Sequence, residues 1–376
     1  MAKGDKFKIG IDARSISNRI CGVSRVTSCL IQALSKIDNE NEYIVYTDSI
    51  LPSVKLGSNF KISLTHCSTK NPIHDLKFYS VLKKDKIALF HVMHSWLPEF
   101  IPQGIKTIVT IHDLFSFTDP QLFIKYKPFH GFLQMYFKYV TARTVKKADA
   151  IITVSNYCKN EIIRHFLEAD GKVKVIYNAS GIARNTIRDE RTRIIKGNYF
   201  LYIGNCRSYK NVEVMIKGFY VFLENDKNFE LKLVMAGNDT CDGIRTIITE
   251  LGIGENIIFL TNPSDQEVAD LYAGALAFIL PSKYEGFGIP VLEAMNFGVP
   301  VIISDAEALV EVAGDAAMVF LKSNPEELVL LMERMVNDNT LRKELIEKGH
   351  NRASKFTWES SATELKNLYQ RILNVL

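Results

Sequence analysis

The chain has 376 residues, of which 47% are hydrophobic and 23% charged. This length and composition are typical of a globular protein with two domains, and they argue against long disordered tracts. The net charge is +4, but residues 1–180 hold 25 Lys and Arg against 15 Asp and Glu. The basic first half indicates either ordinary solvated lysines or attraction to an anionic surface or acceptor.

The six cysteines form no Cys-x-x-Cys pair and show no zinc-ligand spacing (Cys21, Cys29, Cys67, Cys158, Cys206 and Cys241). We therefore expect free thiols in a reducing compartment. The N-terminus lacks the apolar core of a signal peptide, and no apolar run approaches the ~20 residues needed to span a bilayer. These features predict a cytoplasmic protein.

The first half of the chain reads as a series of short apolar strands separated by helical or loop segments. After the first strand, which ends in Asp12, come turn residues and a helical pattern from Arg25 to about Leu34. The expected strands cover residues 7–12, 43–47, 87–92, 107–111 and 150–154. Such βα repeats favour a mostly parallel sheet.

A second series of strands follows a polar stretch at residues 183–196, which we interpret as a linker. The expected strands cover residues 199–203, 231–235, 257–259, 277–280 and 300–303, with helices at 212–223 and 266–272 between them. The sequence thus predicts two Rossmann-like α/β domains, at residues 1–182 and 197–356, with a ligand cleft between them. No G-x-G-x-x-G follows any expected strand, which argues against a dinucleotide enzyme.

Residues 281–295 form the most informative segment, because a glycine-rich loop leads from a buried strand into a helix. Gly286 and Gly288 permit a close approach of the backbone to a ligand, and Pro290 suits the first turn of a helix. Free amides at such a helix start bind anions, phosphate above all. Glu285 and Glu293 flank the loop and would repel phosphate unless they face hydroxyl groups. The segment therefore predicts a nucleotide-sugar site, although a pair of surface acids beside ordinary turn glycines is the alternative.

The segment resembles the donor signature of the retaining family 4 glycosyltransferases, which have the GT-B fold. The E-x7-E spacing lies within Glu-Gly-Phe-Gly-x-Pro-x-x-Glu-Ala. Residues 202–211 are similar to the glycine–basic–lysine segment of that family, and residues 110–113 and 148–155 match segments of its first domain. The resemblance covers nearly the entire chain and implies that a last helix, opening at residues 356–359, crosses back so that 357–376 pack on the first domain.

The resemblance also implies roles for individual residues. Lys210 and Arg207 would neutralise the diphosphate of the leaving group, and His112 would line the cleft near the transferred sugar. With Glu285, these are the expected catalytic residues. The expected donor-binding residues are Gly22, Gly204, Gly286, Phe287, Gly288, Ile289, Leu292 and Glu293. Each role has an alternative without function. Lys210 and Arg207 could be solvated basic residues, His112 a structural histidine at a strand end, and Gly22 part of a simple turn.

No D-x-D occurs in the sequence, so we expect a metal-independent enzyme without a cofactor, in which the basic residues take the place of a metal. Residues 125–147 are unusually aromatic and basic, which indicates either an ordinary core-facing helix or contact with a membrane carrying a lipid-linked acceptor. The partners predicted are a nucleotide-sugar donor and a saccharide or lipid-linked saccharide acceptor. No nucleic acid is expected, and any membrane contact would be peripheral, on the inner face.

The leading hypothesis is therefore a retaining glycosyltransferase that moves a hexose, with mannose weakly favoured, in polysaccharide or glycan biosynthesis. Two alternatives stay open. A sugar-nucleotide epimerase of the same fold would need an added general base, and a non-catalytic sugar-nucleotide-binding module would need a degenerate site.

Overall fold

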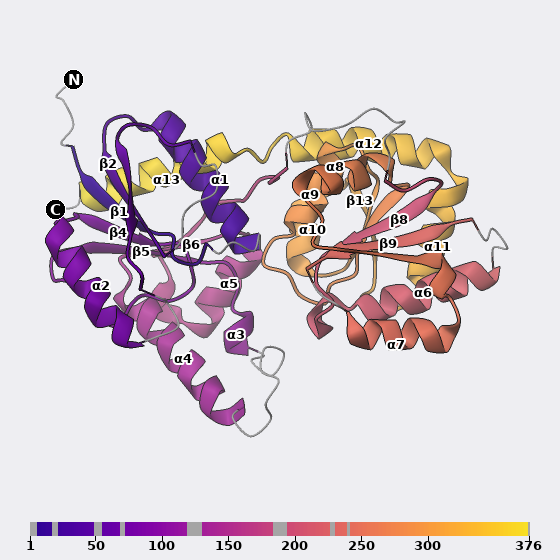
Figure 1. Ribbon diagram of the computed structural model, residues 1–376, viewed down its shortest axis with the longest axis horizontal. Helices are drawn as coiled ribbons and strands as arrows, with labels where there is room; N and C mark the ends of the chain where they lie inside the picture. The colour runs from indigo at the N-terminus through magenta and orange to yellow at the C-terminus, as the bar shows by residue number, and fades with distance from the viewer. Residues whose placement is uncertain are drawn as a thin grey trace. The chain divides into compact units, whose positions relative to one another are not determined.

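The computed structural model describes residues 6–16, 22–48, 55–67, 72–118, 130–182, 194–225, 230–238 and 241–374 (Figure 1). They divide into two compact units. Unit 1 contains the residues up to Asn178 together with those from Thr357 onward, and unit 2 contains Ala179–Phe356. Both units are α/β, so the predicted fold class is confirmed.

Unit 1 is built on seven parallel strands in the order β3-β2-β1-β4-β5-β6-β7. The strands are β1 (Lys8–Asp12), β2 (Glu42–Thr47), β3 (Phe60–Leu64), β4 (Leu89–Val92), β5 (Lys106–Ile111), β6 (Ala150–Thr153) and β7 (Val173–Val175). The helices are α1 (Gly22–Ile37), α2 (Pro72–Asp85), α3 (Phe115–Thr118), α4 (His130–Lys147), α5 (Asn156–His165) and α13 (Trp358–Leu373). Strands β3 and β7, at the two edges, were not predicted from the sequence. β3 is short and partly exposed, so its apolar signal is weak.

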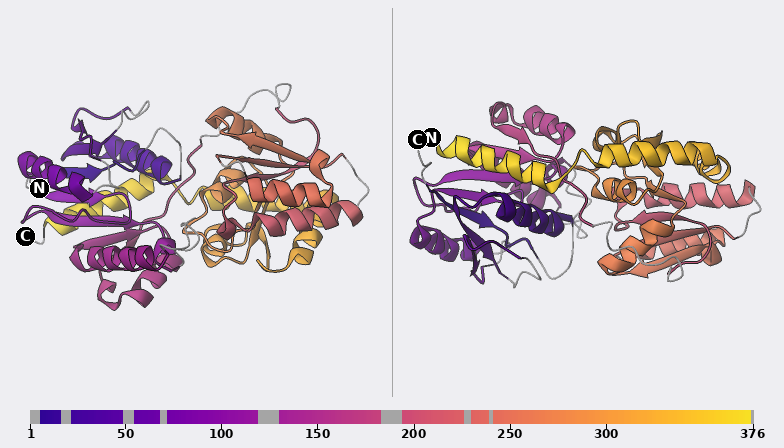
Figure 2. Two further views of the ribbon diagram at one scale, coloured as in Figure 1. Left: turned by 60° about the horizontal axis from the view of Figure 1, so that its bottom comes forward. Right: turned by 90° about the horizontal axis from the view of Figure 1, so that it is seen from above.

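The central strands of unit 1 are buried on both faces, because successive side chains enter different cores. On β4, Leu89 packs into the core shared with α1 and α13, whereas Phe90 and Val92 pack into the core shared with α2, α4 and α5. Leu365 and Leu368 of α13 belong to the first of these cores, and Figure 2 shows α13 in yellow lying along this unit. The expectation that the last helix returns to the first domain is therefore confirmed.

Unit 2 is built on six parallel strands in the order β10-β9-β8-β11-β12-β13. The strands are β8 (Tyr199–Ile203), β9 (Lys232–Gly237), β10 (Ile257–Thr261), β11 (Ala277–Leu280), β12 (Val301–Ser304) and β13 (Ala317–Phe320). The helices are α6 (Val212–Asn225), α7 (Asp242–Leu251), α8 (Asp265–Gly274), α9 (Ile289–Asn296), α10 (Glu307–Ala313), α11 (Pro325–Asn337) and α12 (Asn339–Ala353). Phe200 of β8 packs against Phe219 and Phe222 of α6, while Tyr199 donates a hydrogen bond to the Leu271 carbonyl of α8.

In each sheet the chain order reverses at one point, between β1 and β4 in unit 1 and between β8 and β11 in unit 2. Loops leaving the carboxyl ends of the two strands diverge there, and ligands of open α/β sheets bind in the resulting crevice. The boundary between the units also differs from the prediction. Residues 179–182, expected in the first domain, belong to unit 2, where the Gly181 amide donates to Glu293.

Candidate functional site

At the switch point of unit 2, the loops that follow β8 and β11 are joined by an ion pair. Lys210 Nζ lies 2.6 Å from Glu285 Oε1, and the Ser282 hydroxyl donates to the same oxygen at 2.7 Å. The side chains of Lys210 and Glu285 are only 14% and 13% exposed. The Lys283 amide donates to the Tyr209 carbonyl at 2.8 Å, so the backbones of the two loops are linked as well. Two residues predicted from separate motifs are thus brought together.

The loop after β11 turns into helix α9 through Gly288. This glycine has φ +103°, and a Cβ there would lie 2.6 Å from a Leu309 methyl carbon, so another residue would be strained and crowded. Pro290 stands in the first turn of α9, as predicted, and Gly288 offers no side chain to cap the helix. Helix α9 thus starts on the same loop as Glu285, and in its first turn Pro290 has no amide hydrogen while the Val291 amide donates to the Gly288 carbonyl at 3.0 Å.

Glu293, the second acid of the motif, is in a different environment from Glu285. It is 5% exposed and accepts hydrogen bonds from the Gly181 amide at 3.3 Å and from the Tyr272 hydroxyl at 3.1 Å. Phe287 packs edge-to-face on Phe356. Leu292 is fully buried, and Ile289 is partly buried at the first position of α9. In this structure Glu293 fixes residue 181 beside α9, and Phe287 and Leu292 are packing residues.

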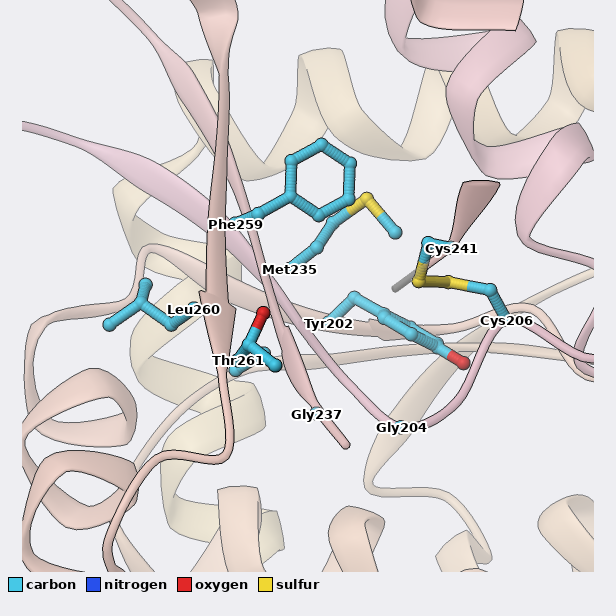
Figure 3. A pocket seen from close by; sticks show the side chains of 10 residues that line it. Tyr202, Gly204, Cys206, Met235, Gly237, Cys241, Phe259, Leu260 and Thr261 are labelled. Carbon is cyan, nitrogen blue, oxygen red and sulfur yellow. A yellow bond between two sulfur atoms is a disulfide. The ribbon is translucent and has the colours of Figure 1, made fainter. Parts of the chain in front are cut away.

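Beside these loops, the carboxyl ends of β8, β9 and β10 surround a small hollow (Figure 3). Tyr202, Met235, Phe259 and Thr261 contribute to its lining. Gly237 permits the close approach of β8 and β9, because a Cβ there would lie 2.0 Å from the Gly204 carbonyl oxygen. Gly204 was predicted from the sequence and Gly237 was not, although a glycine ending an apolar strand is a signal of close backbone approach.

The cysteines next to the hollow correct one prediction. Cys206 and Cys241 form a disulfide, so the expectation of free thiols is wrong for this pair. Cys29, Cys67 and Cys158 are present as thiols. Spacing in the sequence could not reveal the bridge, because the parallel β8 and β9 bring residues 35 apart in sequence to the same edge of the sheet. Arg207, the neighbour of Cys206, is exposed, and its amide donates to Asn205 Oδ1 at 3.2 Å.

In unit 1, the carboxyl ends of β1, β4 and β5 carry a second cluster of polar residues. Asp12 is fully buried, and Arg14 donates to both of its oxygens, at 2.9 and 2.7 Å. Burial alone would raise the pKa of the Asp12 carboxyl, but the charge of Arg14 overcomes it and holds that pKa well below its usual value. His94 Nε2 lies 3.5 Å from Asp12 Oδ2. Asp12 stands out in the sequence as an acid at a strand end, but its pairing with Arg14 and His94 is visible only in the structure.

His112 follows β5 at the same edge. Its Nε2 lies 3.1 Å from the Met93 carbonyl oxygen, which can only accept, so Nε2 carries the proton and Nδ1 is left as an acceptor. Burial lowers the pKa of His112, so its ring is neutral at pH 7. This arrangement suits the acceptance of a hydrogen bond from a hydroxyl group. Gly22 is the exposed first residue of α1, and a Cβ there would meet nothing within 4 Å.

Helix α4 carries an exposed apolar face. Phe132, Met135 and Tyr139 are 66%, 65% and 58% exposed, at spacings that place them on one side of the helix. The helix contains three lysines and one arginine but no acid. The preceding basic and aromatic residues 125–129 lie outside the described residues, as do 183–193 of the expected linker. Over the described parts of the chain, no helix is both long and apolar enough to cross a membrane.

Two family models match adjoining parts of the chain. The model for "Glycosyltransferase Family 4" matches residues 20–180, and the model for "Glycosyl transferases group 1" matches residues 183–352. Among curated proteins, O-antigen chain mannosyltransferase B of Escherichia coli is 28% identical over 79% of this chain and 78% of its own length. O-antigen chain mannosyltransferase RfbU of Salmonella typhimurium is 30% identical over 60% of this chain and 59% of its own length.

Solved structures share the fold over almost the whole chain. The sucrose-phosphate synthase of Thermosynechococcus elongatus matches with a TM-score of 0.79 and 17% identity, covering 99% of this chain and 100% of its own. WaaG, a glycosyltransferase involved in lipopolysaccharide biosynthesis, matches with a TM-score of 0.73 and 16% identity, covering 96% and 99%. Anabaena HepE in complex with UDP-glucose matches with a TM-score of 0.75 and 15% identity, covering 97% and 100%. With two matched family models and two parallel-sheet units of this architecture, the chain belongs to the family 4 glycosyltransferases of the GT-B fold.

Proposed function

We propose that this enzyme transfers a hexose from a nucleoside-diphosphate sugar to a saccharide acceptor during glycan biosynthesis, and that unit 2 binds the donor. The Lys210–Glu285 pair at the switch point carries this proposal. Mannosyltransferases among the curated relatives favour mannose as the hexose. The nucleoside would bind at the carboxyl edge of the unit 2 sheet, with the diphosphate next to Lys210 and the start of α9.

In the free enzyme, Glu285 holds the Lys210 ammonium group. A bound diphosphate carries more negative charge than one carboxylate, so it would take Lys210 as its counterion and free Glu285 to accept hydrogen bonds from sugar hydroxyls. As the glycosidic bond breaks, negative charge grows on the leaving diphosphate, and Lys210 with the exposed Arg207 would stabilise it. His112, neutral and with Nδ1 as acceptor, would receive a hydrogen bond from a sugar hydroxyl.

We also propose that transfer retains the anomeric configuration and needs neither a divalent metal nor a cofactor. The absence of a D-x-D sequence and the cations at the donor loop support this part of the proposal. Activity measured with EDTA and with added Mg²⁺ tests it, and an EDTA-sensitive rate would contradict it. The anomeric configuration of the product, read by NMR, tests retention.

Thermal stabilisation by UDP, GDP, ADP and CMP, followed by turnover of the matching labelled sugar donor, tests the proposed donor site. A nucleotide at a hundred times its dissociation constant adds about 2.7 kcal/mol to the free energy of unfolding. We expect one nucleotide to act, and Lys210→Ala to abolish the shift. Lys217→Ala is the matched control, since Lys217 forms a 2.7 Å pair with Glu213 that is 54% exposed on α6. Binding without turnover would favour a binding module, and turnover of the donor to its epimer would favour an epimerase.

The exposed face of α4 supports a peripheral contact with a membrane that carries a lipid-linked acceptor. Aromatic and apolar side chains enter the interface while neighbouring lysines attract anionic headgroups. We expect sedimentation with vesicles containing phosphatidylglycerol, little binding to phosphatidylcholine vesicles, and loss of binding in Phe132→Ser/Met135→Ser. Leu330→Ser is the control, since Leu330 is 59% exposed on α11. Equal sedimentation of the double variant and the unmodified enzyme would refute the contact.

A further inference from the structure

The disulfide between Cys206 and Cys241 lies in the wall of the hollow at the ends of β8 and β9, and Figure 3 shows its two sulfur atoms beside Tyr202 and Met235. The bond joins two loops of unit 2. Cys206 belongs to the loop that leads from β8 to Lys210, and Cys241 immediately precedes α7. It is therefore a covalent connection between the start of α7 and the loop proposed to bind the diphosphate.

The loop between β8 and Lys210 is held near its start at residues 205 and 206, and at its far end by the Lys210–Glu285 pair and the Lys283 amide. The Tyr202 hydroxyl donates to the Asn205 carbonyl at 2.5 Å, and the Arg207 amide donates to the Asn205 side chain. Arg207 and Ser208 themselves are exposed. Arg207 follows Cys206 directly, so a displacement of Cys206 reaches Arg207 before it reaches Tyr209 and Lys210, which Lys283 and Glu285 hold.

The backbone at Cys241 gives a second sign that the bridge maintains a specific local conformation. Cys241 has φ +54°, in the left-handed region, and its side chain makes no capping hydrogen bond to α7. An L-residue adopts this conformation only when its surroundings enforce it. Because the disulfide is formed by this side chain, it restrains Cys241 directly.

We propose that the Cys206–Cys241 disulfide positions the donor loop, and that its reduction by a dithiol weakens nucleotide binding. This inference rests on the proposed function. Cys206 is partly exposed while Cys241 is 7% exposed, so a dithiol thiolate attacks Cys206 Sγ and expels the Cys241 thiolate at the N-terminus of α7. The second thiol of the reductant then closes on the mixed disulfide. The reductant ends as a cyclic disulfide, and the enzyme as two thiols.

The test is the dissociation constant of GDP, with UDP as the second probe, measured by calorimetry for the oxidised enzyme and for enzyme reduced with dithiothreitol. Mass spectrometry of alkylated peptides establishes the state of the bridge. We expect the dissociation constant to rise about tenfold on reduction, since small displacements of binding groups have large effects. Cys206→Ser/Cys241→Ser should bind as weakly as the reduced enzyme and be insensitive to dithiothreitol. Cys29→Ser, on α1 of unit 1, should behave like the unmodified enzyme in both states.

A lower melting temperature with an unchanged dissociation constant would make the bridge purely structural and overturn the inference. The steady-state constants provide an independent check, because loss of positioning should raise KM for the donor more than it lowers kcat. If no nucleotide binds in either state, the proposed donor site fails and the inference fails with it. If nucleotide binds equally in both states, the donor site stands and only the inference fails.

Discussion

A buried histidine in unit 1 predicts that this unit loses stability in mild acid. His91 on β4 is fully buried, and its two ring nitrogens lie 2.6 Å from the Tyr369 hydroxyl of α13 and 2.8 Å from the Thr110 hydroxyl of β5. Burial disfavours the charged imidazolium and lowers the pKa of His91 to about 3 from its ordinary value of 6.5. The unfolded chain therefore binds a proton at a pH where the folded chain does not.

The sign and size of the effect follow from this difference in pKa. The contribution of neutral His91 to the free energy of unfolding is fully present above pH 6.5. It is lost as the pH falls toward 3, because protons bind preferentially to the unfolded state in that window. From pH 7.5 to pH 5.0 the loss is about 2 kcal/mol. His112, whose pKa is also lowered by burial, acts in the same direction, whereas Asp12 titrates at lower pH.

Urea unfolding followed by tryptophan fluorescence isolates this effect, because both tryptophans of the chain, Trp96 and Trp358, belong to unit 1. His91→Gln cannot bind the proton but can still donate and accept hydrogen bonds. We expect the unmodified enzyme to lose about 2 kcal/mol more than this variant between pH 7.5 and 5.0. Equal losses would refute the argument, and so would an NMR titration that places the pKa of His91 near 6.5.

Three further predictions concern single side chains. Tyr369→Phe should lower the free energy of unfolding of unit 1 by about 1–3 kcal/mol, measured by the same fluorescence, because it leaves a buried imidazole nitrogen without its partner. Gly237→Ala should abolish nucleotide binding in calorimetry, since the new Cβ would overlap a backbone oxygen. Gly243→Ala on α7 is the control and should bind nucleotide normally, because a Cβ there meets nothing within 4 Å. Loss of the bridge in Cys206→Ser/Cys241→Ser should lower the melting temperature of unit 2 in calorimetry, by the equivalent of about 4 kcal/mol for a 35-residue loop. An unchanged transition would contradict that loop-entropy estimate.

The fold was predictable because the apolar runs of the central strands are fully buried on both faces and therefore stand out in the sequence. The edge strands β3, β7 and β13 were missed, since each is short or partly exposed and lacks that signal. Lys210 and Glu285 were each predicted as site residues, from two motifs that follow neighbouring strands of a parallel sheet. Their direct contact could not be predicted, because neither motif indicates that β8 and β11 are neighbours in the sheet.

Other features of the candidate site depend on contacts between distant segments and could not be read from the sequence. The E-x7-E spacing made Glu285 and Glu293 look equivalent, yet the second is buried against Gly181 and Tyr272. The bridge between Cys206 and Cys241 depends on the register of β8 with β9. Spacing identifies which residues are present at a site, whereas burial and register decide what each of them contacts.

The return of α13 to unit 1 has a consequence for how the chain is made. Leu365, Leu368 and Tyr369 complete the core of the unit that begins at the N-terminus, but they are synthesised after all of unit 2. Domains generally fold in the order in which they leave the ribosome. Here the order is reversed, because unit 2 is contiguous and can finish folding while unit 1 still waits for its last helix. The first unit therefore cannot complete its core before α13 has been synthesised, and a chain cut after residue 356 would contain a complete second unit and an unfinished first one.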